Sequence, residues 1–170
     1  MPFDHPLPLE LRTLRDWVRW GASRCREAGL HYGHGADNAL DDVATLMLYS
    51  IGLQPVIPEP YWGAALTAVE RERFLALLAR RIDERLPVPY LVGEAWFCGL
   101  PFAVDRRVLI PRSPIAELIE SGFEPWLQPG QPGAVLDLGT GSGCLAIACA
   151  VLLGDVRVDA VDLDADALAV

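Results

Sequence analysis

The most constraining feature of the sequence is a mostly apolar run that breaks into three alternating glycines and then becomes apolar again. Residues 135–138 lead into Gly139, Gly141 and Gly143, and residues 144–148 are predicted to continue as a helix. Such glycines let the backbone turn sharply and bring its N–H groups, with no side chain in the way, against a ligand at the start of that helix. The pattern predicts a nucleotide-type binding loop, and a tight turn in an ordinary α/β protein is the alternative.

Two acidic residues frame this loop. Asp137 closes the strand before the glycines, and Asp162 closes the next apolar run, at residues 156–161. In a strand–loop–helix–strand unit, a carboxylate at the second strand end lies near a ligand's ribose hydroxyls, roughly 20 residues beyond the glycines. The sequence therefore predicts one cofactor site built from Asp137, Gly139, Thr140, Gly141, Ser142, Gly143 and Asp162.

Composition and charge restrict the class of protein. With 52% hydrophobic and 22% charged residues, the chain is predicted to be neither disordered nor membrane-spanning. Residues 1–6 hold no basic region or apolar signal core, which predicts a cytoplasmic protein. The net charge is -9 and all 14 basic residues are arginines, so direct nucleic-acid binding is not expected. The charge favours a basic protein partner over a polyanionic one, but an acidic net charge is also common in soluble proteins and on its own is better explained in that way.

No metal site is predicted. His31 and His34 lie three residues apart, but no nearby cysteine or carboxylate completes a ligand set. The cysteines form no Cys-x-x-Cys pair, and they are expected to be small buried residues in a reducing compartment: Cys25, Cys98, Cys144 and Cys149.

The first part of the chain has the spacing of amphipathic helices. Helices are predicted over about residues 9–28 and 38–51, each followed by a glycine that ends it. Asp37 or Asn38 is expected to cap the second helix. The prolines at residues 53–63 exclude a helix interior or a central strand there.

A third helix is predicted from the capping box of Thr67 and Glu70 to a point before Pro87. It is expected to bury Val69, Phe74, Leu77, Leu78 and Ile82. Its arginines alternate with acidic residues, which favours a salt-bridged solvent face over a nucleic-acid face. These arginines are Arg71, Arg73, Arg80, Arg81 and Arg85.

The periodicity changes after these helices. Residues 95–98 and 102–104 predict a β-hairpin with its turn at residues 99–101. A further helix is predicted from Ser113 and Pro114 to about Leu127. A loop at residues 128–133 then leads into the glycine unit, whose next helix begins near Asp164.

The glycine spacing distinguishes between families of nucleotide-type sites. Gly-x-Gly-x-Gly after an acidic strand end is not the dinucleotide Gly-x-Gly-x-x-Gly, and no phosphate-binding Gly-Lys-Ser or Gly-Lys-Thr follows it. The stretch resembles the first motif of the Rossmann-like methyltransferases that depend on S-adenosylmethionine. This resemblance implies that the loop approaches the methionine part of S-adenosylmethionine and that Asp162 binds its ribose.

Further stretches are similar to the glutamine methyltransferases that modify protein side-chain amides. Residues 96–102 and 108–112 look like that group's linker between its helical and catalytic domains. Residues 32–38 and 112–118 look like the ribosomal protein branch, which methylates a glutamine of large-subunit ribosomal protein three. The resemblance covers essentially the whole chain, and it implies this ribosomal protein as substrate, with linker contacts at Pro111 and Arg112.

The resemblance implies an α/β chain in three parts. An α-helical substrate-recognition domain covers residues 1–88, a β-hairpin and linker helix cover residues 89–133, and an incomplete Rossmann-like S-adenosylmethionine-binding domain covers residues 134–170. A doubly wound sheet needs several strands with helices on both faces, whereas only two strands are predicted in the third part. The chain is therefore expected to be part of a longer molecule.

The family's catalytic signature, Asn-Pro-Pro-Tyr, does not occur in the sequence. In the family, an Asn side-chain oxygen and a backbone carbonyl accept the two N–H bonds of the substrate amide and hold its nitrogen in line with the methyl group. We therefore expect no catalytic residue in this chain and no turnover by residues 1–170 alone.

Three alternatives remain at this stage. A release factor glutamine methyltransferase has the same linker and loop. An adenine-specific DNA methyltransferase grips a planar amino group in the same way after flipping the base out, but the acidic charge argues against DNA. A non-catalytic interaction module would use residues 1–88 to bind a partner.

Overall fold

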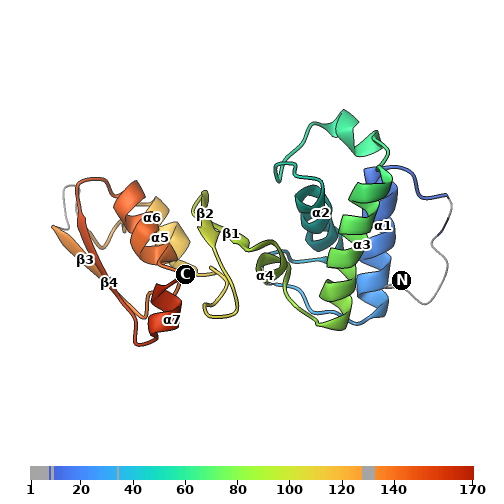
Figure 1. Ribbon diagram of the computed structural model, residues 1–170. Helices are drawn as coiled ribbons and strands as arrows, with labels where there is room; N and C mark the ends of the chain where they lie inside the picture. Colours follow the sequence, from blue (N-terminus) through green and yellow to red (C-terminus); the bar gives the residue numbers. More distant parts are fainter. Residues whose placement is uncertain (1–7, 9, 34, 128–132) are drawn as a thin grey trace. The chain divides into compact units, whose positions relative to one another are not determined.

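The computed structural model describes two compact units, which divide between Val92 and Gly93. The first is helical, and the second combines a hairpin, short helices and a parallel strand pair (Figure 1). This organisation confirms the predicted α/β class, whereas the domain bounds at residues 88 and 133 stay predictions. The structure describes residues 8, 10–33, 35–127 and 133–170. Some sequence predictions fall outside them, at residues 1–6, Leu9, His34 and residues 128–132.

The elements of the N-terminal unit are α1 (Leu14–Glu27), α2 (Ala39–Ser50), the 3-10 helix η1 (Glu59–Gly63), α3 (Ala68–Asp83) and α4 (Val88–Val92). Side chains cap the three long helices, from Thr13, Asn38 and Thr67. The predicted start of the first helix at residue 9 is wrong, because Thr13 and Asp16 form a capping box that begins α1 at Leu14. None of the described helices is long and apolar enough to cross a membrane.

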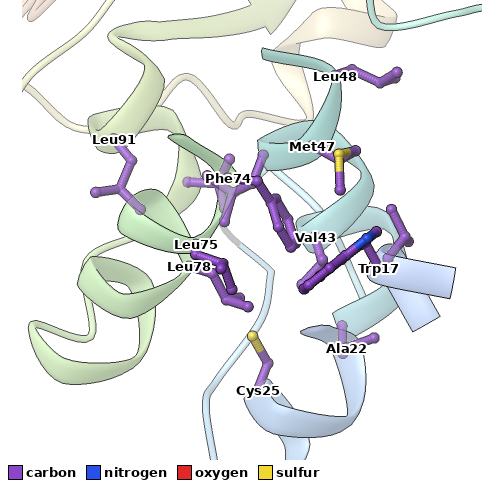
Figure 2. Packing of buried hydrophobic residues seen from close by; sticks show 14 of the residues in the cluster. Trp17, Ala22, Cys25, Val43, Met47, Leu48, Phe74, Leu75, Leu78 and Leu91 are labelled. Atoms are coloured by element: carbon purple, nitrogen blue, oxygen red, sulfur yellow. The ribbon is translucent and has the colours of Figure 1, made fainter. Parts of the chain in front are cut away.

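Helices α1, α2 and α3 pack around an apolar core (Figure 2). Trp17, Val43, Phe74 and Leu78 are at most 2% exposed. The rings of Trp17 and Phe74 meet edge to face with their centroids 6.4 Å apart. A Cβ atom on Gly21 would lie 2.8 Å from Cγ1 of Val43, so α1 approaches α2 at a distance that only glycine permits.

The capping box of α3 gives a prediction that acid titration can test. Glu70 accepts hydrogen bonds from the backbone N–H and the hydroxyl of Thr67, both at 2.8 Å, and these bonds lower its pKa below the ordinary 4.5. A carboxyl group whose pKa is lower in the folded than in the unfolded state stabilises the fold at pH values above its ordinary pKa. This stabilisation is lost as the pH falls through the folded-state pKa. We expect Thr67→Ala to raise the pKa of Glu70, measured by NMR titration.

The control for this titration is Thr45→Ala, which removes an exposed hydroxyl inside α2 that donates to the carbonyl of Asp41. It should leave the pKa of Glu70 unchanged. Equal pKa values for Glu70 in wild type and in Thr67→Ala would contradict the prediction.

The C-terminal unit begins with the predicted hairpin. Strands β1 (Glu94–Phe97) and β2 (Leu100–Ala103) pair antiparallel, and Cys98 and Gly99 form the turn at positive φ. Phe97 and Phe102 are buried in the core of this unit. The hairpin is confirmed, but its turn has two residues, 98 and 99, instead of the predicted three at 99–101.

Helix α5 (Ile115–Glu120) is shorter than the predicted helix to Leu127. Gly122 and Phe123 have φ of +66° and +61°, which ends the helix. The N–H of Phe123 donates to the carbonyl of Leu118, and that of Gly122 donates to the carbonyl of Ile119. This is the Schellman pattern of a helix end at glycine.

The glycine loop belongs to a strand–helix–strand unit made of β3 (Ala134–Leu138), α6 (Cys144–Leu152) and β4 (Arg157–Val161), followed by the short helix α7 (Ala165–Leu168). Strands β3 and β4 are parallel. Helices α5 and α6 lie on one side of the strand pair (Figure 1), where Val135 and Val158 pack against the buried cluster. Leu136 and Leu138 alternate with these positions and are 59% and 72% exposed.

Candidate cofactor-binding site

The glycine loop lies where the carboxyl ends of β3 and β4 meet. Leu138 pairs with Val161 in the parallel register, so Gly139 and Asp162 directly follow neighbouring strands. The N–H groups of Gly139 and Thr140 donate to the carbonyl of Val161 at 2.8 and 3.0 Å. The structure thus brings the two predicted strand ends and the loop together.

Glycine is required at the alternating positions of the loop. The φ angles of Gly139, Gly141 and Gly143 are +76°, +56° and +75°, a left-handed conformation that costs other residues roughly 1–2 kcal/mol. A Cβ atom on Gly139 or Gly141 would meet nothing within 4 Å. The loop therefore presents bare backbone to open space.

Four loop amides are not free donors. Besides the two that donate to Val161, the N–H of Gly141 donates to Oδ2 of Asp162 at 2.8 Å, and that of Gly143 donates to the carbonyl of Thr140 at 2.9 Å. For these amides the prediction that their N–H groups face a ligand is wrong, because the loop turns them toward β4 and onto itself. The carbonyl of Val161 was missed, since a backbone carbonyl has no side-chain signature in the sequence.

Asp162 is held by two backbone N–H groups. Its Oδ2 accepts from Gly141, and its Oδ1 accepts from Asp164 at 2.9 Å. The bonds from Asp164 and Gly141 lower the pKa of Asp162 below its ordinary value, so the carboxyl group is ionised at neutral pH. A carboxylate has about four lone-pair sites, which leaves acceptor capacity for the hydroxyl groups of a ligand.

Thr140 and Asp137 form a second contact inside the loop. The Thr140 hydroxyl donates to Oδ2 of Asp137 at 2.7 Å, and Thr140 is 8% exposed. Burial raises the pKa of the nearby Cys144 thiol. The predicted Thr140 and Ser142 both lie in the loop, where the Thr140 hydroxyl is engaged within the unit and Ser142 is half-buried.

The two predicted linker residues lie between β2 and α5. Pro111 is half-buried and Arg112 is exposed. Both belong to the same compact unit as the glycine loop. Their contacts with a ligand stay a prediction.

The chain is similar to known proteins and to a family model. A family model described as ribosomal protein L11 methyltransferase (PrmA) matches residues 119–170, which include the whole strand–helix–strand unit. The chain is 54% identical over 160 residues to a ribosomal protein uL3 glutamine methyltransferase of Xanthomonas campestris, an alignment that covers 94% of this chain and 52% of that protein. The protein of the same name from Xylella fastidiosa strain Temecula1 is 52% identical over 159 residues, with 94% and 51% covered.

These matches confirm the resemblance seen in the sequence. The chain spans about half the length of the curated relatives that it matches. Over 94% of its length the chain is therefore similar to proteins named ribosomal protein uL3 glutamine methyltransferase, and its residues 119–170 match a methyltransferase family model.

Proposed function

We propose that this chain provides the cofactor loop and a helical substrate-recognition unit of a cytoplasmic enzyme that methylates the side-chain amide of a glutamine in ribosomal protein uL3. The observation that carries the proposal is the glycine loop, fastened at the joined ends of two parallel strands beside an ionised aspartate. The similarity to proteins named for this reaction supports the choice of substrate. The acidic net charge of -9 favours a basic protein partner.

The proposed methyl donor is S-adenosylmethionine, whose positive sulfur activates the methyl group for transfer when it is bound. Two features of the residues present support this donor. The open space over Gly139 and Gly141 admits close approach of an extended ligand, and Asp162 keeps acceptor capacity for ribose hydroxyls. The proposed contacts are Asp137, Gly139, Thr140, Gly141, Ser142, Gly143 and Asp162, with linker contacts from Pro111 and Arg112.

The chain's own residues bind and orient rather than transfer protons. Asp162 anchors the ribose end, and the glycine backbone leaves room for the methionine end. We assign no residue of this chain to the grip on the substrate amide, because the Asn-Pro-Pro-Tyr signature does not occur in it.

The proposal is tested by following amide NMR signals of the chain during titration with S-adenosylmethionine. We expect the signals of Gly139, Gly141 and Gly143 to shift, and Asp162→Ala to weaken binding roughly ten- to a hundredfold, because a charge-assisted hydrogen bond contributes about 1.5–3 kcal/mol. In a second titration, uL3 of Xanthomonas campestris should shift signals from residues 14–92.

The matched control is Asp155→Ala, which removes an exposed aspartate from the loop between α6 and β4. Its affinity should stay within about twofold of wild type. Glycine signals that do not move at millimolar S-adenosylmethionine would refute the cofactor assignment. Movement confined to the C-terminal unit on addition of uL3 would refute the role of the helical unit.

A further inference from the structure

Three consecutive amides fasten the glycine loop to the end of β4. The N–H groups of Gly139 and Thr140 donate to the carbonyl of Val161, and the N–H of Gly141 donates to Asp162, 21 residues later in the chain. The contacts at Val161 use only backbone atoms. The contact at Asp162 uses a side chain, so a single substitution removes it.

A second carboxylate holds the loop from the side of β3. The hydroxyl of Thr140 donates to Asp137, its N–H donates to Val161, and its carbonyl accepts from Gly143. Every polar group of Thr140 is thus engaged inside the unit, and the residue is almost completely buried. The influence of its hydroxyl on a ligand therefore passes through Asp137 and the shape of the loop.

The loop needs such fastening because of its glycines. Glycine populates positive and negative φ about equally, so an unfastened loop with glycine at three alternating positions would sample many shapes. A ligand that must first order the loop binds more weakly than one that meets a loop already in shape. The contacts at both ends accompany the left-handed φ angles of Gly139, Gly141 and Gly143.

We propose that Asp162 and Thr140 are positioning residues that hold the glycine loop in its binding shape before the cofactor arrives. This inference rests on the proposed function and adds a second role to the predicted ribose acceptor. The carboxylate of Asp162 accepts from the Gly141 N–H of the loop and is also the proposed acceptor for the ribose. The same side chain therefore couples the shape of the loop to ribose binding. Thr140 acts through Asp137 and does not touch the ligand with its hydroxyl.

The decisive measurement is amide hydrogen exchange of Gly141 in the chain without ligand. Asp162→Ala should accelerate this exchange about tenfold or more, the factor expected for loss of a hydrogen bond to a charged group. Exchange at Val135 should stay unchanged and so report that the unit is folded. Its amide faces β4, because Gly133 and Gly139, at the same two-residue spacing, both bond to that strand. Asp155→Ala is the matched control and should change neither rate. Unchanged exchange at Gly141 in folded Asp162→Ala would overturn the proposal.

A second pair of variants decides the matter if Asp162→Ala does not fold. Thr140→Ser keeps the hydroxyl and should bind S-adenosylmethionine within about twofold of wild type, whereas the isosteric Thr140→Val should bind about tenfold more weakly. Equal affinities of the two variants would overturn the role of Thr140. Faster exchange in Asp162→Ala without any cofactor binding by wild type would support the fastening and refute the proposed function, so the two failures are distinguishable.

Discussion

Replacing Gly141 with valine is expected to remove most of the affinity for S-adenosylmethionine, with a loss of roughly 10- to 100-fold. Gly141 has φ of +56°, and a β-branched residue is an outlier in that conformation, which costs roughly 1–2 kcal/mol or forces the loop to change shape. A changed loop also withdraws the Gly141 N–H from Asp162. Affinity is measured by NMR titration, and the signals of the helical unit should stay at their wild-type positions.

Gly154→Val separates ligand binding from backbone strain. Gly154 has φ of +75°, and like Gly141 it has nothing within 4 Å of an added Cβ atom, but it lies between α6 and β4. It should lower the stability of the C-terminal unit by a similar amount and leave the cofactor affinity of the folded protein unchanged. Equal losses of affinity in the two variants would show that strain alone explains the effect.

Replacing Arg81 with methionine is expected to destabilise the helical unit by about 3–5 kcal/mol. Nε of Arg81 donates to Oδ2 of Asp42 at 2.8 Å, and each side chain is only 5% exposed. Arg81 also donates to the carbonyl of His31 and lies over the ring of Tyr32. Its removal leaves a buried carboxyl group without its partner. Urea denaturation, followed by NMR signals of the unit, measures the loss.

The neighbouring arginine provides the control. Arg80 pairs with Glu84 at 2.9 Å, but the two side chains are 50% and 40% exposed, and such pairs contribute about 0.2–1 kcal/mol. Arg80→Met should therefore change stability by less than about 1 kcal/mol. Adding Asp42→Leu to Arg81→Met should recover part of the loss, because the unpaired carboxyl is gone. Equal stabilities of Arg80→Met and Arg81→Met would contradict the prediction that breaking the buried Arg81–Asp42 pair costs more than breaking the exposed Arg80–Glu84 pair.

These two arginines also show where reasoning from the sequence stops. Arg80 and Arg81 have the same local composition, and both were predicted to lie on a solvent face. Which of them is buried depends on Asp42, which lies 39 residues away and reaches Arg81 only after α2 packs on α3. Similarly, Val69 was predicted to be buried but is 56% exposed, because the first turn of α3 lies beyond its contact with the core.

Local patterns were more informative. The Thr67 capping box, the hairpin and the strand–glycine–helix order are each set by neighbouring residues, and the structure has all three. The end of α5 at Gly122 also follows a local signal, a glycine just after the helix, although the helix was predicted to continue to about Leu127. In the site, the three glycines could be predicted from the sequence. The acceptors of their N–H groups could not be predicted, because they depend on the register of β3 and β4.

The sulfur atom of Cys25 gives the helical unit an internal reporter of its motions. Cys25 is 0% exposed, and burial raises the pKa of its thiol to about 11. Thiolates, not thiols, react with alkylating reagents, so the folded unit shields this sulfur both sterically and chemically at neutral pH. Alkylation of Cys25 therefore requires the packing of α1 to open, and its rate in the native protein measures how often this happens.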